Sequence, residues 1–103
     1  SAAAKAARDA RIDADRRLDT PARRTVLLVE DDALIRANTA EMLQGSGFIV
    51  VDAASAEDAM TALQTVPIDA LVTDVNLPGV SGPDFARTAR ALRPGVGIVF
   101  ATG

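Results

Sequence analysis

Two groups of acidic side chains follow apolar runs, and their residue types could bind a metal ion or accept a phosphoryl group. Glu30-Asp31-Asp32 closes the apolar run 26–29, and Asp74 closes the run 68–73. Because the carboxyl ends of parallel strands meet at one edge of a sheet, we expect both groups to line one acidic pocket. Clustered carboxylates repel each other unless a cation neutralises them, and Mg²⁺ prefers oxygen ligands. The pattern therefore predicts a Mg²⁺ site.

Within this pocket each residue has a candidate role. Asp74 is the best nucleophile, because a carboxylate can form an acyl phosphate. Glu30 and Asp31 would hold the metal directly or through water, and the main-chain carbonyl oxygen of Asn76 could add a ligand. Thr102 follows the last apolar run, so its hydroxyl could hydrogen-bond a phosphoryl oxygen. A single Asp after a strand is usually a turn or cap residue; only the combination in one register favours a site.

Composition excludes several classes of function. The 103 residues suggest one small domain and include no cysteine, histidine, tryptophan or tyrosine. Disulfides, thiolate metal sites, histidine-based catalysis and a phosphohistidine donor are therefore excluded. The shortage of aromatic residues argues against base stacking, so we expect no direct nucleic-acid binding. No apolar stretch is long enough to span a bilayer, so we expect no membrane partner and a cytoplasmic location.

The chain divides into two units of different charge. Residues 1–24 carry seven basic and four acidic side chains, a net charge of +3, whereas residues 25–103 carry four basic and ten acidic ones, a net charge of −6. We interpret 1–24 as a charged helix or linker, which is either a solvated tail or a connecting or oligomerisation helix. Pro21 marks the break into the folded domain, 25–103.

Apolar runs alternate with helical patterns along the domain. We expect strands at 25–30, 48–51, 68–73 and 97–101, with helices at 33–44, 56–65 and 83–92. Asp32 is a candidate cap for the first helix, Ser55 for the second, and Pro83 suits the start of the third. The last helix is expected to bury Phe85, Ala89 and Leu92. The alternation predicts an α/β fold with a doubly wound parallel sheet and helices on both faces.

At this point the sequence resembles the receiver domain of a two-component response regulator over residues 25–103. The segments that carry the resemblance are Val26-Leu27-Leu28-Val29-Glu30-Asp31-Asp32, then Leu71-Val72-Thr73-Asp74-Val75-Asn76-Leu77-Pro78-Gly79-Val80-Ser81-Gly82, and Ile98-Val99-Phe100-Ala101-Thr102. The resemblance implies a flavodoxin-like fold with the strand order 2-1-3-4-5. The parent protein could be a stand-alone regulator or a hybrid sensor histidine kinase.

The resemblance also implies specific roles. Asp74 would be the phosphoacceptor, taking the phosphoryl group from a histidine of a kinase or phosphotransfer domain. Glu30 and Asp31 would be the acidic pair around Mg²⁺, with Asn76 giving its main-chain oxygen. Thr102 would be the switch hydroxyl. Pro78 and Gly82 would shape the loop after the acceptor, and the first helix would be the face on which the kinase docks.

The sequence departs from the family at its end. The family continues past the fourth strand with a helix, a strand that carries an essential lysine, and a last helix, whereas this chain stops at Gly103 and Lys5 is its only lysine. We therefore expect a domain truncated after the fourth strand. Its last strand would expose an apolar edge, which predicts a homodimer that could exchange elements, with the N-terminal helix over the exposed surface.

Two alternative functions stay open. A pseudo-receiver would act as an interaction or dimerisation module without phosphotransfer; the missing lysine favours it and the intact acidic set opposes it. A Mg²⁺-dependent hydrolase of the aspartyl-phosphate type would need a second Asp two residues after the nucleophile, where this chain has Asn76.

Overall fold

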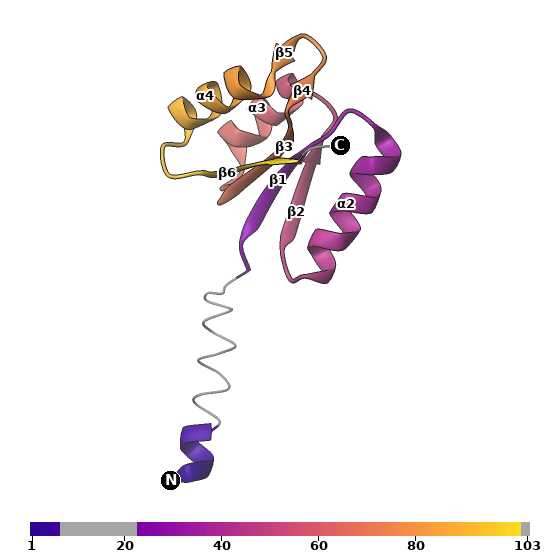
Figure 1. Ribbon diagram of the computed structural model, residues 1–103. Coiled ribbons are helices and arrows are strands. Elements are labelled where there is room, and N and C mark those ends of the chain that lie inside the picture. The colour runs from indigo at the N-terminus through magenta and orange to yellow at the C-terminus, as the bar shows by residue number, and fades with distance from the viewer. Residues whose placement is uncertain (7–22, 102–103) are drawn as a thin grey trace.

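The computed structural model describes residues 1–6 and 23–101, and the second of these segments folds into an α/β domain (Figure 1). Its elements, in chain order, are β1 (Thr25–Val29), α2 (Ala33–Gly45), β2 (Ile49–Ala53), α3 (Ala56–Thr65), β3 (Ala70–Asp74), β4 (Asn76–Leu77), β5 (Val80–Ser81), α4 (Gly82–Leu92) and β6 (Gly97–Ala101). Residues 2–6 are helical. Residues 7–22 of the N-terminal segment predicted as helix or linker, with the predicted break at Pro21, lie outside the described residues, as does Thr102.

Four strands form one parallel sheet in the order β2-β1-β3-β6. The central strand β1 pairs with β2 on one side and with β3 on the other, with Leu27 opposite both Val51 and Leu71. β3 in turn pairs with β6, where Leu71 lies opposite Ile98. This is the predicted order for the first four main strands. It brings the carboxyl ends of β1 and β3 side by side.

The two faces of the sheet are covered to different extents. α3 and α4 lie on one face and pack against each other, while α2 lies on the opposite face beside β1 and β2 (Figure 1). The core is on the α3–α4 side, where Leu27 and Leu71 of the sheet meet Leu63 of α3 and Phe85 of α4. Each such side chain stabilises the fold by about 1.5–3 kcal/mol through burial.

The α2 side is thinner. Val26 and Leu28 of β1 are buried, but no residue of α2 is. Arg36, Thr39, Ala40 and Leu43 recur at helical spacing and are half-buried, whereas Leu34 is 70% exposed, and Ile35 and Met42 are also exposed. Helix α2 therefore carries an apolar surface that the described residues leave in contact with solvent.

One predicted burial is wrong. Leu92 is 37% exposed, although Phe85 and Ala89 are buried as expected. The buried stripe of α4 is Gly82, Phe85, Ala86 and Ala89, and the helix ends at Leu92 before the stripe can complete another turn. Arg93 follows and places its guanidinium against the end of α3, donating to the carbonyl oxygens of Leu63 (2.8 Å) and Val66 (3.0 Å).

The structure also contains an antiparallel hairpin that the sequence analysis did not predict. β4 and β5 pair directly after β3, with Asn76 opposite Ser81 and Leu77 opposite Val80. Gly79 sits in the connecting turn with φ +84°, a conformation that glycine adopts without strain. Leu77 is buried and fixes the hairpin to the core. The structure therefore adds two short strands to the element order expected from the sequence.

Candidate functional site

The acidic residues predicted to share a pocket do come together. Carboxylate oxygens of Glu30, Asp31 and Asp74 all lie within 4.8 Å of one another. Glu30 and Asp31 follow the last residue of β1, Asp74 is the last residue of β3, and Val29 lies opposite Thr73 in the register of the two strands. Glu30 is buried, Asp74 is half-buried and Asp31 is exposed. The cluster thus opens to solvent at the carboxyl edge of the sheet.

The turn between β1 and α2 positions the first two carboxylates. The Glu30 N–H donates to the carbonyl oxygen of Ala53 (3.1 Å), which holds Glu30 beside β2. The Asp32 N–H donates to Glu30 Oε1 (3.2 Å). Asp32 Oδ1 in turn accepts from the N–H groups of Leu34 and Ile35 at 3.0 Å, so Asp32 caps α2 as predicted. The cap commits Asp32 to the helix, and Glu30 and Asp31 remain for the pocket.

The loop after β3 is held close to Asp74. Asp74 Oδ1 accepts a hydrogen bond from the Asn76 N–H (3.3 Å). Gly82 N–H donates to the carbonyl oxygen of Val75 (2.7 Å), so the start of α4 contacts the residue that follows the acceptor candidate. A Cβ at Gly82 would lie 2.8 Å from backbone atoms of Asp74 and Val75. Only glycine permits this approach, which gives a physical reason for the residue that the resemblance singled out.

Burial and like charge act on Glu30 in the same direction. Desolvation raises the pKa of the Glu30 carboxyl, and the nearby charges of Asp74, Asp31 and Asp32 raise it further. The hydrogen bond from the Asp32 N–H opposes them by stabilising the ionised form. A bound divalent cation would relieve the repulsion. The donor set consists of hard carboxylate oxygens converging from two strands, with one side open to solvent, and it fits Mg²⁺.

The predicted site residues therefore fall into three groups. Glu30, Asp31 and Asp74 are brought together, and the main chain of Asn76 lies next to Asp74 through its N–H. The carbonyl oxygen of Asn76 stays a predicted ligand, and Thr102 lies outside the described residues.

Sequence reasoning missed Arg36. Its Nη1 donates to the carbonyl oxygen of Glu30 at 2.8 Å, so this side chain contacts the turn that carries the acidic pair. A signal was present, because Arg36 is the only basic residue between positions 25 and 86. It also follows the acidic cluster at a spacing that puts it in the first turn of the capped helix.

A separate hollow of about 360 Å³ lies at the other end of the sheet, before β1, β3 and β6. Arg24, Asp69 and Arg93 line it. Arg93 is committed to closing the end of α3, and Asp69 accepts a hydrogen bond from the Thr25 N–H (2.7 Å). These side chains join elements of the fold, and the acidic cluster lies at the opposite edge of the sheet. Among the described residues, no helix is both long and apolar enough to cross a membrane.

The comparisons with known proteins agree with this geometry. Residues 26–103 match the family model described as "Response regulator receiver domain". The chain is 35% identical over 81 residues to "Sensor kinase CckA" of Brucella abortus, covering 77% of this chain and 9% of that protein. It is 33% identical over 78 residues to "Response regulator receiver protein CpdR" of the same organism, covering 76% of this chain and 65% of CpdR. It thus spans less than two thirds of these relatives.

Solved structures show the same architecture. A receiver domain described as CheY-like from Methylobacillus flagellatus superposes with a TM-score of 0.75 at 31% identity, over 79% of this chain and 70% of that chain. A response regulator receiver protein from Pseudomonas putida gives a TM-score of 0.72 at 34% identity, over 79% and 69%. With its acidic cluster at the carboxyl edge of a β2-β1-β3-β6 sheet, this chain belongs to the response regulator receiver domain family.

Proposed function

We propose that this chain is a cytoplasmic phosphorelay module that accepts a phosphoryl group from a kinase or phosphotransfer-domain histidine onto Asp74 in a Mg²⁺-dependent reaction. One observation carries the proposal: carboxylate oxygens of Glu30, Asp31 and Asp74 lie within 4.8 Å of one another where β1 and β3 end side by side. Family membership supports signal transduction as the general role.

In the proposed reaction a carboxylate oxygen of Asp74 attacks the phosphorus of a phosphohistidine. The new P–O bond forms as the P–N bond breaks, and the imidazole leaves with the electron pair of that bond. Glu30 and Asp31 would hold the Mg²⁺, which would supply positive charge against the phosphoryl oxygens. The main-chain carbonyl of Asn76 would add a ligand, and the hydroxyl of Thr102 would be the switch group that hydrogen-bonds the phosphoryl group.

The exposed apolar surface of α2 is suited to bind a helix of a partner protein. Leu34 and Ile35 expose apolar side chains beside the acidic edge, because α2 begins directly after the Glu30–Asp32 turn, and Met42 is exposed further along the same helix. An amphipathic helix of a histidine phosphotransfer domain could bury them while presenting its histidine to Asp74.

The test uses the full chain with Mg²⁺ and acetyl phosphate as a small donor, read by intact mass. We expect a mass increase of one phosphoryl group that hydroxylamine removes, since hydroxylamine cleaves acyl phosphates. Asp74→Asn should abolish the product, while Asp52→Asn, an exposed aspartate of β2 outside the cluster, should retain it. Binding of beryllofluoride with Mg²⁺ gives a second readout that needs no donor chemistry.

One observation favours a second role, that of a non-phosphorylated pseudo-receiver acting in dimerisation. Edge strand β6 leaves Val99 56% and Phe100 39% exposed, and such an edge can pair with another chain. A homodimer with or without exchanged elements would bury these side chains. If Asp74 neither takes up a phosphoryl group nor binds beryllofluoride while the chain self-associates, the pseudo-receiver is the correct description.

A further inference from the structure

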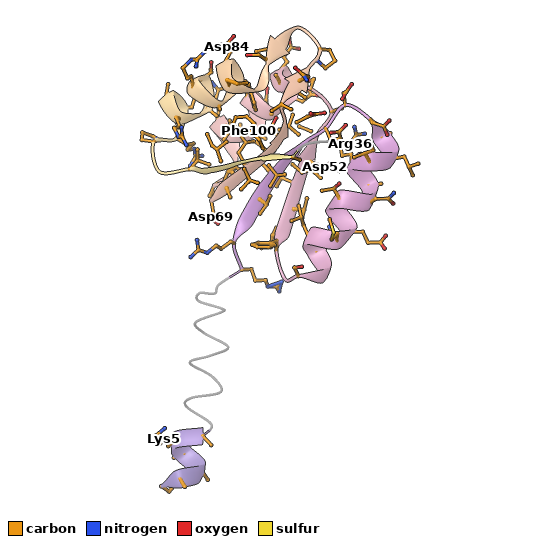
Figure 2. The ribbon with its side chains drawn as sticks, in the orientation of Figure 1. Lys5, Arg36, Asp52, Asp69, Asp84 and Phe100 are labelled. Carbon is orange, nitrogen blue, oxygen red and sulfur yellow. The ribbon has the colours of Figure 1, made fainter. Side chains whose placement is uncertain are left out.

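The guanidinium of Arg36 reaches back from α2 to the strand end before it. Arg36 is the fourth residue of α2, and its N–H makes a helical hydrogen bond to the carbonyl oxygen of Asp32 (2.8 Å). Its side chain is half-buried, and Nη1 donates to the carbonyl oxygen of Glu30 (2.8 Å). Figure 2 labels Arg36 at the end of α2 that lies nearest the carboxyl edge of the sheet.

The acceptor of this hydrogen bond, the carbonyl oxygen of Glu30, lies in the turn that carries the acidic pair. The carbonyl of Glu30 belongs to the peptide that joins Glu30 to Asp31, the two residues placed on the metal side of the pocket. It lies one residue past the end of β1, while the Glu30 N–H is tied to Ala53 of β2. The backbone of Glu30 is thus held on both sides: its N–H is bonded to β2, and its carbonyl oxygen is bonded to α2 through Arg36. The backbone that carries both carboxylates is therefore held in place.

Arg36 also keeps the carboxylates available. In the part of the chain that the structure describes, its guanidinium forms no ion pair with a carboxylate, and its side-chain hydrogen bond goes to the backbone. A cation bonded directly to Glu30 or Asp31 would compete with a metal ion for the same oxygens. Because the Arg36 guanidinium bonds the backbone of the turn, it leaves the carboxylate oxygens of Glu30 and Asp31 available to a metal ion.

We propose that Arg36 is a positioning residue for the divalent cation site: it fixes the Glu30–Asp31 peptide so that the two carboxylates converge with Asp74. The inference rests on the Mg²⁺ site of the proposed function and adds to it a residue that touches neither metal nor phosphoryl group. Partners that orient metal ligands from outside the ligand set commonly change metal affinity by about 10–100-fold when they are removed.

The experiment measures Mg²⁺ affinity of the full chain by titration calorimetry. Arg36→Met removes both the charge and the hydrogen bond and should weaken binding about 10-fold or more. Arg36→Lys keeps the charge and one donor and should recover part of the affinity. The matched control is Arg90→Met on α4, an exposed arginine whose loss changes net charge equally without touching the turn, and it should bind as the wild type does.

A second readout does not depend on bound metal. In Mg²⁺-free protein, the amide resonances of residues 30–32 should shift in Arg36→Met and stay in place in Arg90→Met, with resonances of the α3–α4 core unchanged in both. Unchanged Mg²⁺ affinity in a folded Arg36→Met protein overturns the inference, as does an equal loss in Arg90→Met, which would assign the effect to bulk charge.

Failure of the proposed function gives a different result. If Mg²⁺ affinity depends on Arg36 but Asp74 takes up no phosphoryl group, the positioning role of Arg36 is supported and the proposed phosphotransfer to Asp74 is wrong. If the wild-type chain does not bind Mg²⁺ at all, both fall together. If Arg36→Met does not fold, Arg36→Lys is measured in its place. Its Mg²⁺ affinity must then be lower than that of the wild type and of Arg90→Met.

Discussion

At the scale of single residues, Glu30 shows how a binding site works against the stability of its own fold. Its carboxylate is buried at the end of β1 with the carboxylates of Asp31 and Asp74 close by. Two unit charges about 4 Å apart repel by about 1 kcal/mol even at the dielectric constant of water. A fold selected for stability alone would not collect these groups, and their presence is consistent with a site that a cation completes.

This arrangement predicts a pH dependence for Glu30→Gln. The folded state raises the pKa of Glu30 above its ordinary value of 4.5, so the stability attached to this group is complete below that value and is lost as pH rises through the folded pKa. Gln keeps an oxygen that can accept from the Asp32 N–H and removes the charge. In Mg²⁺-free urea unfolding, the variant should therefore exceed the wild type near pH 7, by on the order of 1 kcal/mol.

The advantage of Glu30→Gln should shrink toward zero as the pH approaches 4. Glu41→Gln, at an exposed position on α2, is the matched control and should follow the wild-type profile. A variant that is less stable than the wild type at pH 7 would show that the carboxylate contributes more through its hydrogen bond than it loses through burial and repulsion.

At the scale of elements, the start of α4 is locked against the residue after Asp74. Ser81 caps the helix by accepting from the Asp84 N–H (3.2 Å), and Gly82 N–H donates to the Val75 carbonyl. The hairpin β4–β5 closes the loop between them. These contacts tie Asp74, the loop that follows it and the start of α4 into one unit through backbone atoms.

Gly82→Ala tests that unit. Its Cβ would meet the carbonyl oxygens of Asp74 and Val75 at 2.8 Å, and backbone cannot move aside as a flexible side chain can. We expect a loss of about 2 kcal/mol or more in the free energy of unfolding. Gly95→Ala, where nothing lies within 4 Å and φ is not in the left-handed region, should stay within about 0.5 kcal/mol of the wild type. Equal stability of the two variants would contradict the close approach.

The elements also show where sequence reasoning succeeds. Strands β1, β3 and β6 are apolar runs between turn residues, and the caps Asp32 and Ser55 mark helix starts, so their approximate positions follow from local chemistry. The hairpin β4–β5 was missed because two-residue strands are too short to show a periodicity, although Pro78-Gly79 signals the turn. The exposure of Leu92 depends on where α4 ends relative to α3, which local pattern does not contain.

At the scale of the whole molecule, the acidic site was predictable because topology alone brings the ends of β1 and β3 together. Alternating strands and helices imply a parallel sheet, and carboxylates that end two neighbouring strands must then meet at one edge. Arg36 was not predictable in this way. Its bond to the Glu30 carbonyl depends on how α2 is set against the sheet and on one side-chain conformation.

In the sheet formed by the described residues, β6 is an outer strand, and this edge is the subject of the last prediction. Strand β6, in yellow in Figure 1, lies at the opposite end of the strand order from β2, and Val99 lies opposite Val72 on the face that α2 covers only near β1 and β2. An apolar parallel edge with unpaired N–H and C=O groups favours association with another chain. We therefore expect the wild-type chain to self-associate as its concentration rises, measured by light scattering.

A charge on that edge should prevent the association. Val99→Lys places an ammonium group at the centre of β6, where desolvation on pairing with a second chain is unfavourable, and we expect the dimer dissociation constant to rise at least about 10-fold. Leu92→Lys adds the same charge at an exposed apolar position at the end of α4, outside the β6 strand itself, and should leave association unchanged. If Val99→Lys self-associates as the wild type does, the dimer does not use β6; if Leu92→Lys dissociates equally, net charge rather than the strand edge controls assembly.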